Sequence, residues 1–357
     1  MTIQVLSAAQ VIARLASFGA VIDARSPGEF AEDHLPWAVN WPVLGDAERK
    51  LVGTEYKQVS AFEARKRGAA LVAKNIAAHI ERDVMHQAKT WQPLVYCWRG
   101  GQRSGSMAWF LDQMGFRTHV LEGGYKAFRA AVMAELETLP LRLQFNVVCG
   151  KTGSGKTRLL GALRDAGAQV LDLEALARHR GSVLGMLPGR PQPSQKAFET
   201  AVWNALRHVD AQRPVFVEAE SKKIGNLRVP EALIHQMREH GRCLNVAMPD
   251  SGRLALLLQD YDFFVRDVDL FCRQLDCLLT LRGRETVHAW QTAARAGRIN
   301  EVFLELMHMH YDPGYLKSMR ANFVGFADAR VVELADGEAG TLKRAAAELL
   351  EESAAAR

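Results

Sequence analysis

The sequence of 357 residues lacks an apolar run of the roughly eighteen residues that a membrane-spanning helix requires. Its first ten residues, MTIQVLSAAQ, contain no basic patch followed by an apolar stretch, which a signal peptide would show. It also lacks internal repeats. We therefore expect a cytoplasmic protein that does not enter a membrane.

Cysteine is scarce as well, with five residues in the whole chain, too few and too scattered to indicate a disulfide framework. Cys149, Cys243, Cys272 and Cys277 are interpreted as small buried hydrophobic residues. The spacing of Cys272 and Cys277 is not typical of a zinc site. Only Cys97 lies in a sequence context that indicates chemistry.

The sequence has only a small excess of positive charge. It contains 45 Lys and Arg and 40 Asp and Glu, which gives a net charge of +5. This balance weakly favours an anionic partner such as RNA or a phosphate-bearing small molecule. Hydrophobic residues make up 48% and charged residues 24%, which is ordinary for a soluble globular protein and excludes a disordered or collagen-like chain. The length predicts two or three domains.

Short apolar runs alternate with helical patterns through two successive blocks of the chain, which predicts an α/β fold with two parallel-sheet domains. The runs expected to form strands are residues 20–24, 93–98, 118–121, 145–149, 168–173, 214–217 and 243–248. We place the domains at residues 1–137 and 141–250, followed by a mostly helical C-terminal region at 251–357. Residues 340–357 are interpreted as a solvated Ala/Glu-rich helix.

The first chemical motif follows the strand at 93–98 and precedes a helical pattern at 105–114. It reads Cys97-Trp98-Arg99-Gly100-Gly101-Gln102-Arg103-Ser104. A glycine-rich loop at a helix N-terminus points backbone N–H groups and the positive end of the helix dipole inward. Such a loop, with two arginines, stabilises a thiolate and binds an oxyanion beside it. We expect Cys97 to be catalytic and the next residues to form an anion cradle, namely Trp98, Arg99, Gly100, Gly101, Arg103 and Ser104.

The second motif, GKTGSGKT at residues 150–157, matches the P-loop pattern and lies between an expected strand and helix. We expect Lys156 to neutralise phosphate oxygens and the Thr157 hydroxyl to serve as a magnesium ligand. Glu218 and Glu220, after the strand at 214–217, offer carboxylates for the same metal or act as structural caps. The residues expected to bind phosphate are Gly150, Thr152, Gly153, Ser154, Gly155, Lys156 and Thr157.

The N-terminal block resembles the rhodanese family over residues 5–137. The resemblance rests on Asp23-Ala24-Arg25, Glu29-Phe30, the segment HLPWAVN at 34–40 and the segment LEGGY at 121–125. It implies that Cys97 carries a transferable chalcogen as a persulfide or its selenium equivalent. The loop is one residue longer than in typical sulfur-transferring rhodaneses and has the spacing of related cysteine phosphatases. Phosphate-ester hydrolysis and use of a phosphate-containing donor are therefore both open.

Both motifs together, in this order, resemble the bacterial tRNA 2-selenouridine synthases. The resemblance also rests on residues 98–101, 172–177, 179–182, 193–199 and 218–225. It implies conversion of 2-thiouridine to 2-selenouridine at the tRNA wobble position, with selenium from selenophosphate carried by Cys97. It further implies an S-geranyl-2-thiouridine intermediate, made from geranyl diphosphate whose diphosphate the P-loop holds.

The same resemblance implies no tightly bound cofactor, with selenophosphate and geranyl diphosphate as co-substrates and magnesium as an optional ion. The residues expected to contact substrate are Asp172, His179, Arg180, Ser182, Glu218, Glu220, Lys222 and Lys223. The basic residues interpreted as a tRNA surface include Lys50, Arg65-Lys66-Arg67 and Arg228. The alternatives are a rhodanese-type sulfurtransferase or cysteine phosphatase with a nucleotide-binding partner domain, and a P-loop kinase with a decayed rhodanese module.

Overall fold

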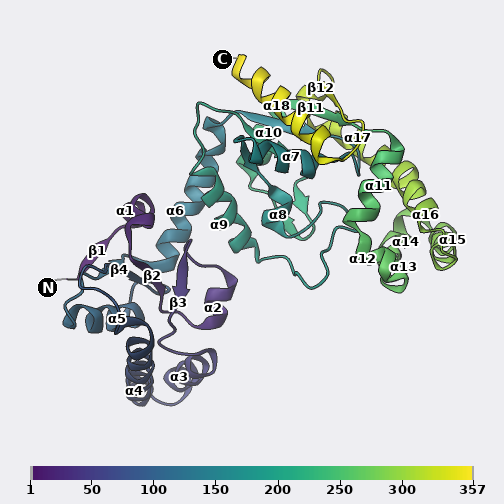
Figure 1. The fold of residues 1–357 in the computed structure, drawn as a ribbon. Helices are drawn as coiled ribbons and strands as arrows, with labels where there is room; N and C mark the ends of the chain where they lie inside the picture. Colours follow the sequence, from purple (N-terminus) through teal and green to yellow (C-terminus); the bar gives the residue numbers. More distant parts are fainter. Residues whose placement is uncertain (1–2, 356–357) are drawn as a thin grey trace. The chain divides into compact units, whose positions relative to one another are not determined.

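The computed structural model describes residues 3–355, which divide into two compact units (Figure 1). The first unit runs to Glu135 and also contains Pro193–Asn204, whereas the second contains Leu136–Gln192 and the chain from Ala205 onward. The predicted three-region division therefore differs from the structure in two ways. A helix from the middle of the chain belongs to the first unit, and the C-terminal region shares one unit with the P-loop.

The first unit is built on a parallel five-stranded sheet in the order β1-β5-β4-β2-β3. The strands are β1 (Gln4–Leu6), β2 (Ala20–Asp23), β3 (Ala38–Asn40), β4 (Pro93–Tyr96) and β5 (His119–Leu121). Every residue of the central strand β4 is buried, which explains its continuous apolar run. The loop that carries Cys97 leaves the carboxyl end of this central strand, the usual ligand-binding edge of a parallel sheet.

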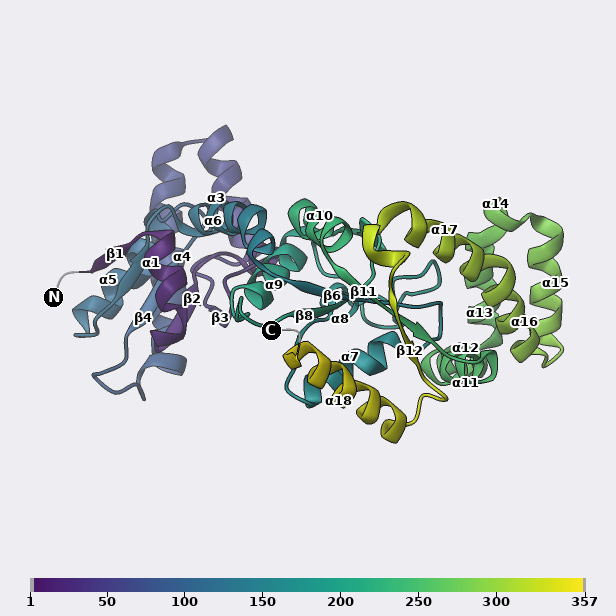
Figure 2. The same cartoon turned by 90° about the horizontal axis from the view of Figure 1, so that it is seen from above.

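Helices cover this sheet, and two of them form a separate hairpin. The helices are α1 (Ala8–Arg14), α2 (Pro27–Glu32), α3 (Asp46–Gln58), α4 (Ala61–His79), α5 (Gln102–Gln113), α6 (Gly124–Thr138) and α9 (Gln195–Leu206). Helices α3 and α4 are inserted between β3 and β4 and pack against each other as an antiparallel pair (Figures 1 and 2). Neither the length of α3 nor its pairing with α4 was predicted from the sequence.

The second unit also contains a parallel five-stranded sheet, in the order β12-β11-β6-β8-β7. Its strands are β6 (Phe145–Cys149), β7 (Gln169–Leu171), β8 (Val215–Glu218), β11 (Arg242–Ala247) and β12 (Arg330–Glu333), with a small antiparallel pair, β9 (Lys223–Ile224) and β10 (Leu227–Arg228). The five residues of β6 are all buried, and β6 leads directly into the P-loop. The predicted α/β class with two parallel sheets is confirmed.

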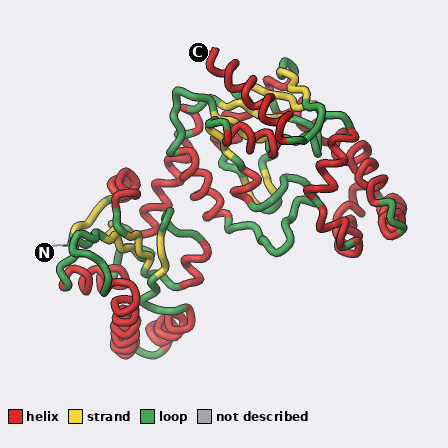
Figure 3. Tube along the Cα trace, viewed as in Figure 1, coloured by secondary structure: helices red, strands yellow, loops and turns green. Residues whose placement is uncertain are grey.

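The helices of the second unit fall into two sets. Those around the sheet are α7 (Lys156–Asp165), α8 (Leu173–Ala177), α10 (Glu231–Glu239) and α18 (Ala339–Ala355). Those of the helical part are α11 (Asp250–Asp260), α12 (Asp262–Arg266), α13 (Val268–Leu275), α14 (Leu279–Arg282), α15 (Arg284–Arg295), α16 (Ile299–Glu305) and α17 (Asp312–Asn322). Figure 3 shows the helical part as helices joined by loops. It has its own core, in which Phe264, Phe271, Trp290 and Phe303 are buried.

The C-terminal region departs from the prediction at two elements. Strand β12 was expected to be helical, but it pairs with β11 and extends the sheet at its edge. Helix α18 is not a solvated tail, because it packs on α7 and buries Leu342, Ala346 and Leu349. These residues recur at intervals of three or four, the spacing of one helix face. Among residues 3–355, no helix has both the length and the apolar character that crossing a bilayer requires.

One buried arginine joins the helical part to the P-loop. The Arg253 side chain on α11 is 2% exposed, and it makes hydrogen bonds of 2.6 and 3.0 Å to both carboxylate oxygens of Asp312 on α17. Its Nε also donates to the carbonyl of Thr152 in the P-loop, 3.0 Å away. Arg253 also pairs with Asp250 at 2.8 Å, so two carboxylates and the loop carbonyl together fix the position of its guanidinium.

We expect Asp312→Ala to lower the free energy of unfolding by about 2 kcal/mol or more, because the buried Arg253 guanidinium loses two charge-assisted hydrogen bonds and keeps only the half-exposed Asp250 as an acidic partner. The control is Asp262→Ala, which removes the exposed carboxylate that pairs with Arg266 on α12. That change should cost less than about 1 kcal/mol. Urea denaturation of both variants measures the difference, and equal losses would contradict the role assigned to the buried pair.

Candidate functional site

The loop that carries Cys97 closes tightly against the start of α6. Gly100 has a φ of +66°, and the Cys97 carbonyl accepts the N–H of Tyr125 at 2.8 Å. A Cβ placed on Gly124 would lie 2.2 Å from the Cys97 carbonyl oxygen and 2.5 Å from the Gly100 nitrogen. Only glycine allows this approach. The segment at 121–125 therefore shapes the cradle, a role that the sequence resemblance alone does not specify.

The Cys97 thiol lies at the base of the loop, where the residue is 3% exposed. The Ser104 hydroxyl, on the first turn of α5, donates to Cys97 Sγ at 3.1 Å. Ser104 is itself fully buried, so this donor is fixed in place. Such a hydrogen bond stabilises negative charge on sulfur. The structure thus brings together the two ends of the predicted motif.

The two arginines of the cradle differ in their surroundings. Arg103 forms an ion pair with Glu29, with Nη1 and Oε2 2.7 Å apart. Although burial acts to raise it, the pKa of Glu29 is held below its usual value by the hydrogen bond and charge of Arg103. Arg99 is exposed and forms no ion pair among residues 3–355. Arg99 therefore carries the uncompensated charge beside the thiol.

A cleft in the first unit is lined in part by residues of the Cys97 loop. Its lining consists of Ser26, Gly28, Glu29, Glu32, Asp46, Arg49, Trp98 and Arg103. Arg49 adds a second cation near Glu29, with Nε and Oε2 3.2 Å apart. The Trp98 ring stacks on Tyr125, with centroids 5.4 Å apart. The cleft thus brings two arginines, both paired with Glu29, together with two further carboxylates and the Trp98 ring, next to the residue that carries the thiol.

A buried polar network supports Tyr125 from behind. Its hydroxyl donates to Asp33 at 2.7 Å, and the same Asp33 oxygen accepts a 2.8 Å hydrogen bond from Thr200 on α9. Arg25, paired with Asp23, lies 4.1 Å from the Tyr125 ring centroid. Sequence reasoning missed Asp33 and Thr200 as functional supports, since they are 167 residues apart. The only sequence signal was that each lies in or next to a segment of the family resemblance.

The P-loop has the geometry that its sequence predicts. Gly153 and Gly155 have φ angles of +79° and +86°, and α7 begins at Lys156. Lys156 Nζ donates to the Gly150 carbonyl at 2.7 Å, and the Tyr315 hydroxyl on α17 accepts the Gly150 N–H at 2.6 Å. The Lys156 ammonium thus lies across the loop mouth. Tyr315 was not predicted, because it is 165 residues away in the sequence.

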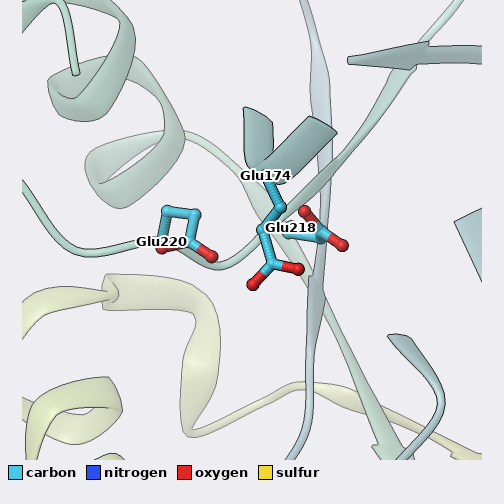
Figure 4. A group of neighbouring side chains, drawn as sticks. All are labelled: Glu174, Glu218 and Glu220. Atoms are coloured by element: carbon cyan, nitrogen blue, oxygen red, sulfur yellow. The ribbon is translucent and has the colours of Figure 1, made fainter. Parts of the chain in front are cut away.

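Three glutamates gather beside the P-loop (Figure 4). Ligand oxygens of Glu174, Glu218 and Glu220 lie within 4.8 Å of one another, and the Thr157 hydroxyl is 3.4 Å from Glu174. Burial, followed by the neighbouring carboxylates, raises the pKa of Glu174 and of Glu220 to about 8. Burial and then Glu174 raise the pKa of Glu218 well above its usual value.

These carboxylates fit a divalent cation. Glu218 is 1% exposed, and neither of its carboxylate oxygens has a hydrogen-bond partner in the described part of the chain. Buried oxygens without donors, next to a threonine hydroxyl, form the oxygen-rich ligand set that magnesium prefers. The sequence singled out Glu218 and Glu220 but not Glu174, which the first turn of α8 brings to the other two.

The second unit contains a cleft above the P-loop. Some of the remaining residues predicted to contact substrate line this cleft, and others lie elsewhere. Arg180, Ser182 and Glu220 line the cleft above the P-loop with Tyr261 and Tyr311 of the helical part. Arg180 lies 5.1 Å from the centroid of the Tyr261 ring. Asp172 instead caps α8 by accepting the Ala175 N–H.

Three predicted substrate contacts in this part of the chain stay predictions, whereas one prediction about the cysteines is wrong. His179 is buried beside the cleft, while Lys222 and Lys223 are exposed and not among its lining residues. Of the cysteines predicted to be core residues, Cys277 is exposed and the other three are buried.

An apolar cavity adjoins the phosphate end of this cleft. It shares Thr152, Ser182, Leu257, Tyr261 and Tyr311 with the cleft. The further lining residues are all apolar, namely Leu184, Phe264, Phe303, Leu306 and Met307. The second unit therefore places the P-loop cleft beside a small apolar cavity of about 20 Å³, which is room for one water-sized molecule.

Comparison with known families assigns both units. Residues 7–131 match the rhodanese-like domain, and residues 143–275 match the tRNA 2-selenouridine synthase AAA domain. The tRNA 2-selenouridine synthase of Nitrosomonas europaea is 36% identical over 247 residues, which cover 68% of this chain and 63% of that protein. The enzyme of Shewanella piezotolerans is 35% identical over 265 residues, covering 73% and 71%.

The match thus spans a little under two thirds of the length of the Nitrosomonas relative. Among solved structures, a rhodanese-like domain protein from Staphylococcus aureus is 16% identical and covers 35% of this chain and 91% of its own, with a TM-score of 0.23.

The glutamate cluster gives stability a distinctive pH dependence. Because the pKa of Glu174 and of Glu220 is about 8 in the folded state, the folded chain holds protons that the unfolded chain releases near 4.5. This stabilisation is complete below the unfolded value and is lost as the pH rises through about 8.

We expect the free energy of unfolding to fall between about pH 5 and pH 8, and Glu220→Gln to flatten that fall. Glu348→Gln, on the exposed face of α18, is the control and should follow the wild-type profile. Magnesium should stabilise the wild type more at pH 8 than at pH 6, because cation binding requires ionised carboxylates. Denaturant titrations across this pH range measure the free energy of unfolding of the wild type and both variants, and of the wild type with magnesium. A wild-type profile as flat as that of Glu220→Gln would refute the raised pKa of the glutamate cluster.

Proposed function

Because the chain belongs to the tRNA 2-selenouridine synthase family, we propose that it replaces the sulfur of 2-thiouridine with selenium at the wobble position of tRNA. The observation that carries this proposal is the pairing of a thiol cradle with a phosphate cradle beside an apolar pocket. A selenophosphate donor and a prenyl diphosphate need these two different sites. The proposed partners are therefore tRNA, selenophosphate and geranyl diphosphate.

For the selenium step, we propose that selenophosphate binds at the Cys97 loop, with Arg99 and the loop N–H groups holding its phosphate oxygens. Electron balance decides which atom the thiolate attacks. Selenium in selenophosphate is at the selenide level, so moving it onto Cys97 as a selenosulfide, with phosphate leaving, would require an oxidant. Attack on phosphorus requires none. The S–P bond forms, the Se–P electron pair leaves with selenium, and water later hydrolyses the S–P bond to thiol and phosphate.

The wide loop and the Ser104 hydroxyl support this assignment. A five-residue spacing between Cys97 and Arg103 suits a tetrahedral phosphoryl group. The Ser104 hydroxyl, 3.1 Å from Sγ, stabilises the thiolate when it leaves phosphorus in the hydrolysis step. The selenium-loaded Cys97 inferred from the sequence stays a prediction, and isotopic labels distinguish the two routes.

The experiment incubates the protein with selenophosphate labelled either at phosphorus or at selenium, followed by rapid acid quench. We expect the phosphorus label to remain on the wild-type protein and the selenium label to be released. Cys97→Ser should retain neither label, and Ser104→Ala should accumulate the phosphorus label, because its hydrolysis lacks the hydroxyl. Selenium label on Cys97 would favour the selenosulfide route, whereas fast turnover of thiosulfate or phosphate esters without RNA would favour the alternative enzyme classes.

For the geranyl step, we propose that the P-loop binds the diphosphate and that the prenyl chain enters the adjoining apolar cavity. The side chains that line this cavity must move apart to admit the chain, because the cavity holds only about 20 Å³. Geranylation turns the thiocarbonyl sulfur into an alkylthio group, which is a better leaving group for the incoming selenium. Lys156 would hold the departing diphosphate oxygens, and Tyr261 and Tyr311 would line the junction between head group and tail. A magnesium ion held by Thr157 and the glutamate cluster would supply positive charge to the diphosphate.

We expect Lys156→Ala to reduce geranylation of 2-thiouridine tRNA by about a hundredfold or more, since charge stabilisation of a leaving group contributes about this much. The same variant should still acquire the phosphorus label on Cys97, because that chemistry belongs to the other unit. Mass spectrometry of nucleosides from the treated tRNA measures the product. Full geranylation with an unchanged KM for geranyl diphosphate would exclude this role of the P-loop.

A further inference from the structure

The α3–α4 hairpin carries an exposed surface that neither the fold nor the two chemical sites explain. At its tip, the turn between the helices exposes three large hydrophobic side chains. Tyr56 is 51% exposed, Val59 is 76% exposed and Phe62 is 65% exposed. Together with Lys57 and Arg65 they form what we call the tip patch. Exposed aromatic residues clustered in this way mark an interaction site rather than a core.

The charge around the tip patch is positive after local pairing is considered. Glu55 pairs with Arg67, and Glu63 pairs with Lys66, so the acidic residues near the tip are neutralised. Lys57 and Arg65 are exposed and form no ion pair in the described part of the chain. The same holds for Lys50 and Lys74, one on each helix of the hairpin. The surface therefore presents uncompensated positive charge between aromatic rings.

The base of the hairpin is joined to the Cys97 cleft by a hydrogen bond and an ion pair. The Asp46 carboxylate at the start of α3 accepts the Gly28 N–H at 3.0 Å, and Arg49 pairs with Glu29. Both residues line the cleft. At the other end, the Ser60 hydroxyl caps α4 by accepting the Glu63 N–H. From Arg49 to Lys57 the helix rises about 12 Å, so a strand that enters the cleft also reaches the tip.

Resting on the proposed function, we infer that the α3–α4 hairpin is the tRNA-binding arm of the first unit. Lys50, Lys57, Arg65 and Lys74 would contact phosphates, and Tyr56 and Phe62 would stack on unpaired bases next to the modified uridine. Anticodon-loop bases are available for such stacking because they are not paired. Aromatic rings interleaved with cations are the combination that single-stranded RNA requires, since rings bind bases and cations bind the backbone.

The test measures binding of unmodified tRNA to the full-length protein by fluorescence anisotropy over a series of salt concentrations. We expect Lys57→Ala/Arg65→Ala to weaken binding about tenfold and to reduce the slope of log K against log salt by about 1.4 to 1.8, because two phosphate contacts are lost. Phe62→Ala should weaken binding about fivefold with the slope unchanged, because stacking is not ionic. The matched control is Lys343→Ala/Arg273→Ala, which removes two exposed cations of the second unit that form no ion pair among residues 3–355 and should leave both quantities unchanged.

The outcomes separate this inference from the function it rests on. If the wild-type protein binds no tRNA, the proposed function fails. If the wild type binds tRNA and Lys57→Ala/Arg65→Ala binds it with the same affinity and salt slope, the hairpin is not the tRNA-binding arm. The proposed function is then unaffected. If gel filtration shows a wild-type dimer that Phe62→Ala converts to a monomer without loss of tRNA affinity, a second copy of the chain covers the tip patch and the inference is overturned. Labelling of Cys97 by selenophosphate should be unaffected in the arm variants, which confirms that they are folded.

Discussion

In each unit, a buried arginine paired with an aspartate connects a chemically active loop to the rest of the fold. Arg253 binds Asp312 and the Thr152 carbonyl of the P-loop. Arg25 binds Asp23 and lies against Tyr125, whose N–H holds the Cys97 carbonyl. Loops that present N–H groups to an anion cannot satisfy those groups internally, so their shape has to be fixed from outside. The buried pairs fulfil this requirement, at the cost of removing two charges from water.

The central parts of both sites could be predicted from the sequence because they are local. Cys97 with its loop and the P-loop with its helix are each encoded within eight consecutive residues. Their hydrogen-bonding groups belong to the same short segment. The buried strands β4 and β6 were predicted for a similar reason, since a strand buried on both faces is a continuous apolar run.

What the sequence could not supply are contacts between distant segments. Tyr315 over the P-loop, Glu174 beside Glu218, and Thr200 on Asp33 depend on tertiary packing and carry no local signature. Strand β12 was missed because a four-residue edge strand with only one buried position is too short to show a period in its apolar residues. Helix α18 was misjudged from its alanine content, although the spacing of Leu342, Ala346 and Leu349 already defines a buried face.

The chain leaves the second unit at Gln192, supplies Pro193–Asn204 to the first, and returns at Ala205. A polypeptide ending at Glu135 would therefore lack Thr200 and the rest of α9, and Asp33, which accepts the Tyr125 hydroxyl, would lose its second buried donor. The two modules cannot be separated or recombined by a single cut in the gene, because one helix of the thiol module is encoded within the P-loop module. Exchange between relatives would have to transfer both modules together, so inheritance keeps the two chemistries in one polypeptide.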